Sequence, residues 1–190
     1  MGHSGSGKST LIKILGLMDK ASSGKYQING SNVNSLSDEE ESRLRMENVG
    51  FIFQDYKLDA NLRAIENVIL PMLINKKIDK KERINLATNL LKSVGLENRI
   101  NHFPKEMSGG EQQRVCIARA LANNPDYILA DEPTGNLDEE NEIKVLNILK
   151  ELSQKGKCVI VVSHSNEIVK YADQVLNLSQ GKLVKNNETE

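Results

Sequence analysis

The chain opens with MGHSGSGKST, in which Gly2 to Ser9 fit the pattern G-x-x-x-x-G-K-[ST]. Glycines in such a stretch let the backbone curl so that several N–H groups face one anion. Apolar residues keep helical spacing from Leu11 to Met18, so we expect a helix whose positive N-terminal end faces the same anion. A loop of this kind joins a buried strand to a helix, which constrains the chain to an α/β fold.

The rest of the chain fits an α/β core with an α-helical subdomain inserted in it. VGFIF, DYILADE and KCVIVVSH predict buried strands, the last two parallel and apolar on both faces. AIENVILPMLIN, KKERINLATNLLKSVG and GGEQQRVCIARALANN predict helices. A capping box at Ser37 and Glu40 predicts a further helix, and Asp138 can cap a helix that runs to about Leu152. The C-terminal part suggests a hairpin around Gln180.

We therefore expect one domain over residues 1–190, with a mostly parallel core sheet formed by 1–60 and 123–190. Residues 61–122 form the helical subdomain in this division. The net charge of −1, from 25 basic and 26 acidic residues, gives no indication of nucleic-acid binding. Two distant cysteines and the lack of a long apolar run suggest a cytoplasmic protein.

Two adjacent carboxylates, Asp131 and Glu132, end the second predicted strand. The carboxyl ends of strands in an α/β sheet are where ligands bind. Asp131 can support a metal ion there, and Glu132 can orient or deprotonate a water molecule. An acid pair of this kind can also be a helix cap or simply solvated, but the phosphate-binding loop favours the functional interpretation.

The stretch MSGGEQQRVCIARAL contains a second capping box, formed by Ser108 and Glu111. A cap does not explain Gly109 and Gly110, since each glycine in a helix costs about 0.5–1 kcal/mol relative to alanine. We expect them to let an anion approach the start of this helix.

These motifs together resemble the ATPase domains of ABC transporters. GHSGSGKST resembles their Walker A motif, YILADE their Walker B motif and SGGEQQRVCIARAL their signature motif. Gln54 resembles the Q-loop glutamine, Asp138 the D-loop aspartate and His164 the H-switch histidine. All six follow the family order, and ADEPTGNLD and NVILPML are similar to the lipoprotein-releasing and macrolide-exporting subgroup.

The resemblance implies ATP and Mg²⁺ as cofactors and a role for each motif. Catalysis would involve Lys8, Gln54, Glu132 as the base and His164 as its link to the γ-phosphate. Ser9, Gln54 and Asp131 would serve the metal ion. The nucleotide would be bound by Gly2, His3, Ser4, Gly5, Ser6, Gly7, Lys8, Ser9 and Thr10, and by Ser108, Gly109, Gly110 and Asp138. His3 has no expected role in proton transfer.

The resemblance also implies partners. Ser108, Gly109 and Gly110 would contact the nucleotide of a second copy, so that a homodimer or a paired ATPase domain forms two composite sites. Integral membrane permease subunits would hold the protein at the inner face of the cell membrane and couple ATP hydrolysis to export or release of a substrate. The alternatives are an ATP-gated regulatory module of a membrane complex, as in the cell-division relatives, and a poorly active truncated remnant.

The remnant hypothesis comes from the start of the chain. Family members have an antiparallel β-subdomain and a first core strand before the loop, and only Met1 precedes it here. The resemblance therefore implies that both are missing and that Met1 is an internal methionine or the start of a truncated gene. A lost central strand would remove burial comparable to a domain's net stability of about 5–15 kcal/mol.

Overall fold

The computed structural model describes residues 5–179 and 181–185. At its centre is a parallel sheet of three strands in the order β3-β4-β5, with bounds Val49–Ile52, Tyr127–Asp131 and Cys158–Val162. Tyr127 pairs with Val49 on one side and with Cys158 on the other. All three strands were predicted from apolar runs. Because the strands are parallel, their carboxyl ends meet at one edge of the sheet, and Gln54, Glu132 and His164 follow them there.

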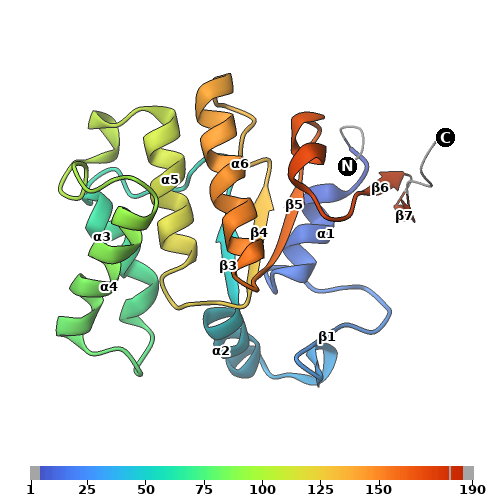
Figure 1. Cartoon of the computed structure of the whole chain (residues 1–190). Helices are drawn as coiled ribbons and strands as arrows, with labels where there is room; N and C mark the ends of the chain where they lie inside the picture. The colour runs from blue at the N-terminus through green and yellow to red at the C-terminus, as the bar shows by residue number, and fades with distance from the viewer. Residues whose placement is uncertain (1–4, 180, 186–190) are drawn as a thin grey trace.

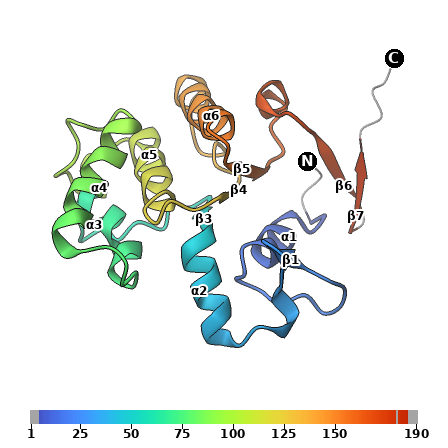
Figure 2. The same cartoon turned by 60° about the horizontal axis from the view of Figure 1, so that its bottom comes forward.

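Helices cover both faces of this sheet, and Figure 2 shows α6 on one side and α1 on the other. Helix α1 (Lys8–Leu15) buries Ile12 against Phe51 and Leu129 of the sheet. Helix α6 (Glu139–Gln154) packs against the core with one apolar face, whose buried residues are Val145, Leu146, Leu149 and Leu152. Helix α2 (Asp38–Asn48) leads directly into β3, and both hydrogen bonds of the predicted Ser37–Glu40 capping box are present.

Helices α3, α4 and α5 gather beside β3, at the left of Figure 1. Their bounds are Ala64–Ile69, Lys80–Ser93 and Gly109–Ala120. The first is shorter than the sequence predicts, because the chain tightens into a 3₁₀ turn over Leu70–Leu73. Pro71 lies in that turn, and proline lacks the N–H that a continuing α-helix needs. One apolar core runs from these helices to the sheet and α6.

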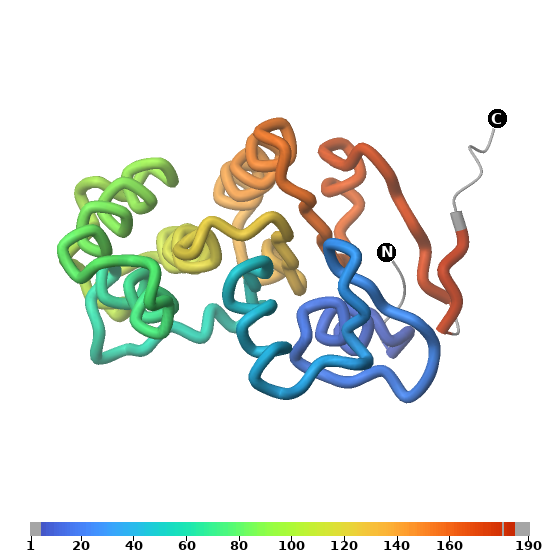
Figure 3. The backbone as a smooth tube through the Cα atoms, turned by 90° about the horizontal axis from the view of Figure 1, so that it is seen from below, coloured from blue at the N-terminus to red at the C-terminus, as the bar shows by residue number. Residues whose placement is uncertain are grey.

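The remaining elements lie at the periphery. A two-residue antiparallel ladder joins β1 (Gln27–Ile28) to β2 (Ser31–Asn32). Short 3₁₀ helices span Val33–Ser35, Pro104–Glu106 and Glu167–Tyr171. The C-terminal hairpin pairs β6 (Leu176–Ser179) with β7 (Lys182–Lys185), and Gln180 lies outside the described residues. Figure 3 shows this hairpin at the opposite end of the molecule from the α3–α5 group.

Strand β5 differs from its prediction as a strand buried on both faces. Cys158 is exposed, and Val159, Ile160 and Val161 are only half-buried. Among the described residues β5 is an edge strand of its sheet, and a hollow of about 560 Å³ lies between it, α1 and α6. An apolar strand at an edge has only one paired neighbour, so the apolar sequence alone overestimated its burial.

Within the described part of the chain, no helix has both the length and the apolar character needed to cross a membrane.

Candidate functional site

The loop before α1 has the backbone that its glycines predict. Gly5 and Gly7 have φ values of 79° and 95°, in the left-handed region that favours glycine. The Oγ atom of Ser6 is buried in the loop without a hydrogen-bond partner. An orphaned hydroxyl beside the N-terminus of a helix suits an anionic ligand, which can accept the missing hydrogen bond. Gly2, His3 and Ser4 lie outside the described residues.

Ser9 and Asp131 meet although 122 residues separate them in the sequence. Ser9 lies in the first turn of α1 and donates its hydroxyl to the Asp131 carboxylate at 3.3 Å. Asp131 is the last residue of β4. A hydroxyl and a carboxylate beside a phosphate-binding loop are the oxygen ligands that Mg²⁺ takes in nucleotide sites. The residues present therefore fit Mg²⁺ at this point.

Glu132 and His164 form a second contact, between the residues that follow β4 and β5. The Nδ1 atom of His164 lies 2.9 Å from Oε1 of Glu132, and the His164 backbone N–H donates to Oε2 at 3.3 Å. Both oxygens of one carboxylate are therefore engaged by one residue. The Glu132 side chain is 11% exposed and that of His164 is 70% exposed, so the pair reaches from the interior to the surface.

Glu132 also has an unusual backbone. Its φ is 46°, a left-handed conformation that a non-glycine residue rarely adopts. Its N–H donates to the Val162 carbonyl at 2.9 Å, which extends the pairing of β4 and β5 by one residue. Strain of this kind persists where the surroundings over-determine the backbone, and it concentrates at functional sites.

Gln54 lies close to Glu132. A Cβ atom added at Gly135 would lie 3.9 Å from the Gln54 Nε2 atom and 3.8 Å from the Glu132 Cβ atom, so both side chains flank the same glycine. Gln54 is exposed at the end of β3. An amide there can donate to, or accept from, a ligand above the strand ends.

The residues that follow Gln54 are tightly held. Tyr56 and Lys57 are both left-handed, with φ values of 57° and 52°. Arg119 of α5 donates to the carbonyls of both residues, and the Cys116 thiol lies 3.1 Å from the Tyr56 carbonyl oxygen. These contacts fasten the loop to α5.

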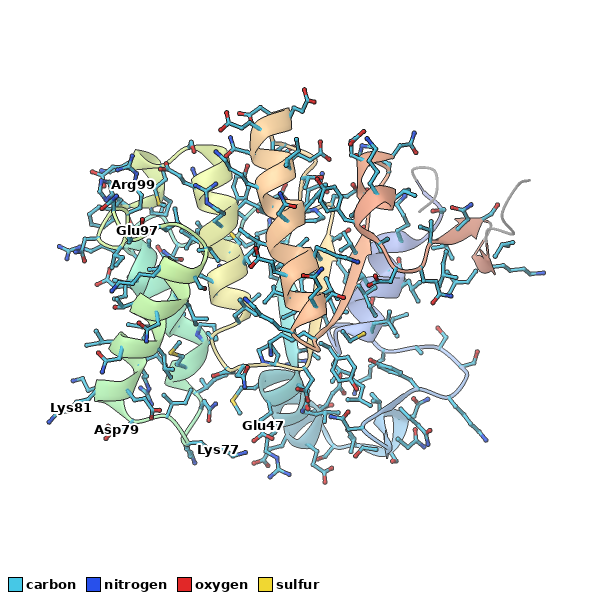
Figure 4. The ribbon with its side chains drawn as sticks, in the orientation of Figure 1. Glu47, Lys77, Asp79, Lys81, Glu97 and Arg99 are labelled. Carbon is cyan, nitrogen blue, oxygen red and sulfur yellow. The ribbon has the colours of Figure 1, made fainter. Side chains whose placement is uncertain are left out.

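Ser108 begins α5 with the predicted capping box, accepting from the Glu111 N–H at 3.2 Å while its own N–H donates to the Glu111 carboxylate at 2.8 Å. The Glu111 carboxylate also pairs with Arg99, which Figure 4 labels near the top of the α3–α5 group. Ser108 itself is exposed, and can contact a ligand outside this chain.

The two glycines of α5 have packing roles that the sequence did not reveal. A Cβ atom at Gly110 would lie 2.2 Å from the Asn141 Oδ1 atom, and one at Gly109 would lie 2.9 Å from the Tyr56 hydroxyl. Gly110 is buried. Glycine is therefore required at position 110 for the close approach of α5 to α6, in addition to any contact with an anion.

Asp138 caps α6, as predicted. Its carboxylate accepts from the backbone N–H and the side-chain amide of Asn141, both at 2.9 Å. These hydrogen bonds lower the pKa of Asp138 below its ordinary value of 3.8, so the cap is charged at neutral pH. Because Asn141 also packs on Gly110, Asp138 and the start of α5 lie on either side of one side chain.

The sequence-predicted residues thus fall into two groups. Ser9, Gln54, Asp131, Glu132 and His164 gather where the parallel strands end, and Lys8, the first residue of α1, directly precedes Ser9. The second group surrounds the contact of α5 with α6, and consists of Ser108, Gly109, Gly110 and Asp138. This division suits a ligand that is bound by the first group of one chain and contacted by the second group of another chain.

Comparison with known proteins agrees with the motifs. The family model described as ABC transporter matches residues 1–135. An uncharacterized ABC transporter ATP-binding protein of Methanocaldococcus jannaschii, MJ1508, is 48% identical over 184 residues, covering 97% of this chain and 82% of that protein. The macrolide export ATP-binding/permease protein MacB of Pasteurella multocida is 44% identical, but the chain spans only 28% of its length.

Solved structures show the same fold. The dimeric structure of a post-hydrolysis state of the ATP-binding cassette MJ0796, bound to ADP and Pi, superposes with a TM-score of 0.87 at 41% identity. The match covers 97% of this chain and 83% of that one. A second dimeric MJ0796 structure, a bacterial ABC transporter cassette, gives a TM-score of 0.88 at 42% identity over 96% of this chain and 81% of that one.

Proposed function

This chain belongs to the ABC transporter family as one of its ATP-binding, ATP-hydrolysing domains, and from that premise we propose that it powers export or release of a substrate by permease subunits in a membrane. The names of its MacB relatives, which combine an ATP-binding part with a permease, support the export role. The permeases would hold the chain at the cytoplasmic face of the membrane. The single observation that carries the enzymatic part is the Glu132–His164 contact beside the Ser9–Asp131 contact.

The first group of residues binds the nucleotide in this proposal. The loop from Gly2 to Thr10 holds the phosphates, with Lys8 on the β- and γ-phosphates. Ser9, Asp131 and Gln54 hold Mg²⁺, which when bound neutralises charge that builds up on the phosphates. The buried Ser6 hydroxyl and the left-handed glycines of the loop support this assignment, because both suit a bound anion.

Glu132 is the general base of the reaction. Its carboxylate accepts a proton from the attacking water, whose oxygen forms the bond to the γ-phosphorus while the bond to the β,γ-bridging oxygen breaks, giving ADP and phosphate. His164 donates from Nδ1 to Glu132 and so fixes the direction of the carboxylate. Gln54, which lies beside the same glycine as Glu132, orients the water.

The second group serves another copy of the chain. Two chains arranged head to tail place Ser108, Gly109 and Gly110 of one against the γ-phosphate bound by the other, with Asp138 beside the junction. The exposure of Ser108 at the start of α5 supports this arrangement, as does the dimeric state of the MJ0796 structures. We also keep the division into a core (1–60 and 123–190) and a helical subdomain (61–122) as a proposal.

Replacing Glu132 with glutamine tests the enzymatic part, because the amide keeps the shape of the side chain but cannot take a proton. We expect Glu132→Gln to lower kcat by about 10²–10⁴-fold while ATP binding is retained. The control is Glu139→Gln, an exposed glutamate in the first turn of α6, which should hydrolyse ATP at the normal rate. Normal hydrolysis by Glu132→Gln would contradict the assignment.

A further inference from the structure

One carboxylate of α6 joins the two loops that carry Glu132 and His164. The Oε1 atom of Glu142 accepts a hydrogen bond from the Thr134 hydroxyl at 3.0 Å and another from the Ser165 hydroxyl at 3.1 Å. Thr134 follows Glu132 by two residues, and Ser165 directly follows His164. A single oxygen atom therefore links the loop after β4 to the loop after β5.

The contact between Glu132 and His164 needs such a link. The His164 side chain is 70% exposed, so packing does not fix its position, and its 2.9 Å contact depends on where the backbone of its loop lies. Glu132 is mostly buried, but its left-handed φ of 46° persists only if the surrounding structure imposes it. Both residues thus depend on how the two loops are held.

Glu142 is well placed to hold them, because it projects from a rigid element. Its backbone N–H donates to the Asp138 carbonyl at 2.8 Å in the first turn of α6, and Val145 and Leu146, one turn further along the helix, are buried in the core. Thr134 is 4% exposed, so one hydroxyl of the bridge is sheltered from competing water. A charged acceptor also makes a stronger hydrogen bond than a neutral one.

The Ser165 side of the bridge is ordered by further hydrogen bonds. The Ser165 N–H donates to the Ser163 hydroxyl at 3.0 Å, and the Glu167 N–H donates to the Ser165 hydroxyl at 3.3 Å. Ser163 is 2% exposed. The turn that presents His164 is therefore connected, through the Ser165 hydroxyl, to Glu142 and so to α6.

We propose that Glu142 is a positioning residue for ATP hydrolysis, which sets the spacing of the loops after β4 and β5 so that His164 Nδ1 meets Glu132 Oε1. Glu142 acts through this pair and has no contact with the nucleotide in the mechanism above. The inference rests on the role proposed for His164 and adds a residue that none of the six motifs includes.

Variants of Glu142 separate this role from a general effect on folding. We expect Glu142→Ala, which loses both hydrogen bonds, to lower kcat by roughly tenfold or more while the KM for ATP changes by less than about twofold. Glu142→Gln keeps an acceptor oxygen and should recover most of the rate. Glu139→Ala, in the same turn of α6 but exposed, is the matched control and should not change the rate.

A double-mutant cycle with His164→Ala gives the decisive comparison. If Glu142 acts through the His164 contact, Glu142→Ala should lower kcat by less than about twofold once His164 is alanine. An equal loss in both backgrounds, or a loss in Glu142→Gln as large as in Glu142→Ala, overturns the inference while His164 keeps its role. Normal hydrolysis by His164→Ala alone would instead remove the proposed role of His164, and the inference with it.

Thermal unfolding of each variant is measured alongside the kinetics. If Glu142→Ala does not fold, Thr134→Val and Ser165→Ala remove the two hydrogen bonds one at a time and go through the same cycle. Each should lower kcat in the normal background and have little effect with His164→Ala. Folded single variants with normal kcat would overturn the inference.

Discussion

Glu132 combines a strained backbone with a fully engaged carboxylate. A left-handed φ in a non-glycine residue costs of the order of 1–3 kcal/mol, so the fold must hold it there. The hydrogen bond from its N–H to Val162 and the two contacts with His164 do so. The cost is consistent with a residue that is oriented before the substrate arrives.

The two cysteines differ in burial, and their thiols should therefore differ in reactivity. Cys116 is buried in α5, and burial raises its pKa to about 12, whereas Cys158 is exposed at the start of β5. We expect one thiol to react quickly with a thiol reagent at pH 8 in the native protein and both to react in guanidinium, because the thiolate is the reactive form. Cys158→Ser should abolish the fast reaction, and two fast thiols in the native protein would contradict the assigned burial of Cys116.

At the scale of elements, the backbones of β3 and α5 approach each other closely at Gly50. A Cβ atom added at Gly50 would lie 2.3 Å from the carbonyl oxygen of Ala120, the last residue of α5. A backbone atom cannot move aside as a flexible side chain can, so the strand and the helix would have to separate. Glycine at this position therefore determines how the α3–α5 group is attached to the sheet.

The variant Gly50→Ala tests this attachment. We expect it to lower the free energy of unfolding by about 1–3 kcal/mol, the usual cost of overpacking. Gly135→Ala is the matched control for stability, since a Cβ there would meet its nearest atom at an ordinary 3.6 Å and its φ is not positive. Equal urea midpoints for Gly50→Ala and the parent protein would contradict the packing described here.

Most elements were predictable because their signals are local. The Ser37–Glu40 and Ser108–Glu111 capping boxes span four residues each, and both helices begin where these boxes predict. The contacts between distant residues have no such signal. Arg119 and Tyr56 lie 63 residues apart, and nothing in either stretch indicates that they are hydrogen-bonded.

The same limit applies to the candidate site. Ser9, Asp131, Glu132 and His164 were found from motifs, because each follows a recognisable strand or loop. Glu142 belongs to no motif and looks like any acidic residue in the first turn of a helix, where acids favour the helix dipole. Its two hydrogen bonds to separate loops depend on how α6 packs against the sheet, which no local sequence pattern indicates.

For the whole molecule, the proposed function requires a site that one chain does not complete. The residues proposed to bind the nucleotide lie at the strand ends, and the start of α5 presents an exposed Ser108 beside α6. The Glu47–Lys77 ion pair, labelled in Figure 4, connects the α3–α5 group to α2 on the side where the strands begin, away from their carboxyl ends. The proposed dimer would therefore form on the side of the strand ends.

The native mass of Glu132→Gln protein with ATP and Mg²⁺ tests this claim most directly, because a chain that binds but does not hydrolyse ATP should stay closed on its partner. We predict a mass twice that of the 21.2 kDa chain, with two ATP molecules bound, and a return to one chain when ATP is removed. Adding Ser108→Arg should keep the protein monomeric while each chain still binds ATP. A Glu132→Gln protein that binds ATP and remains a monomer, or a dimer that Ser108→Arg does not disturb, would contradict the composite site.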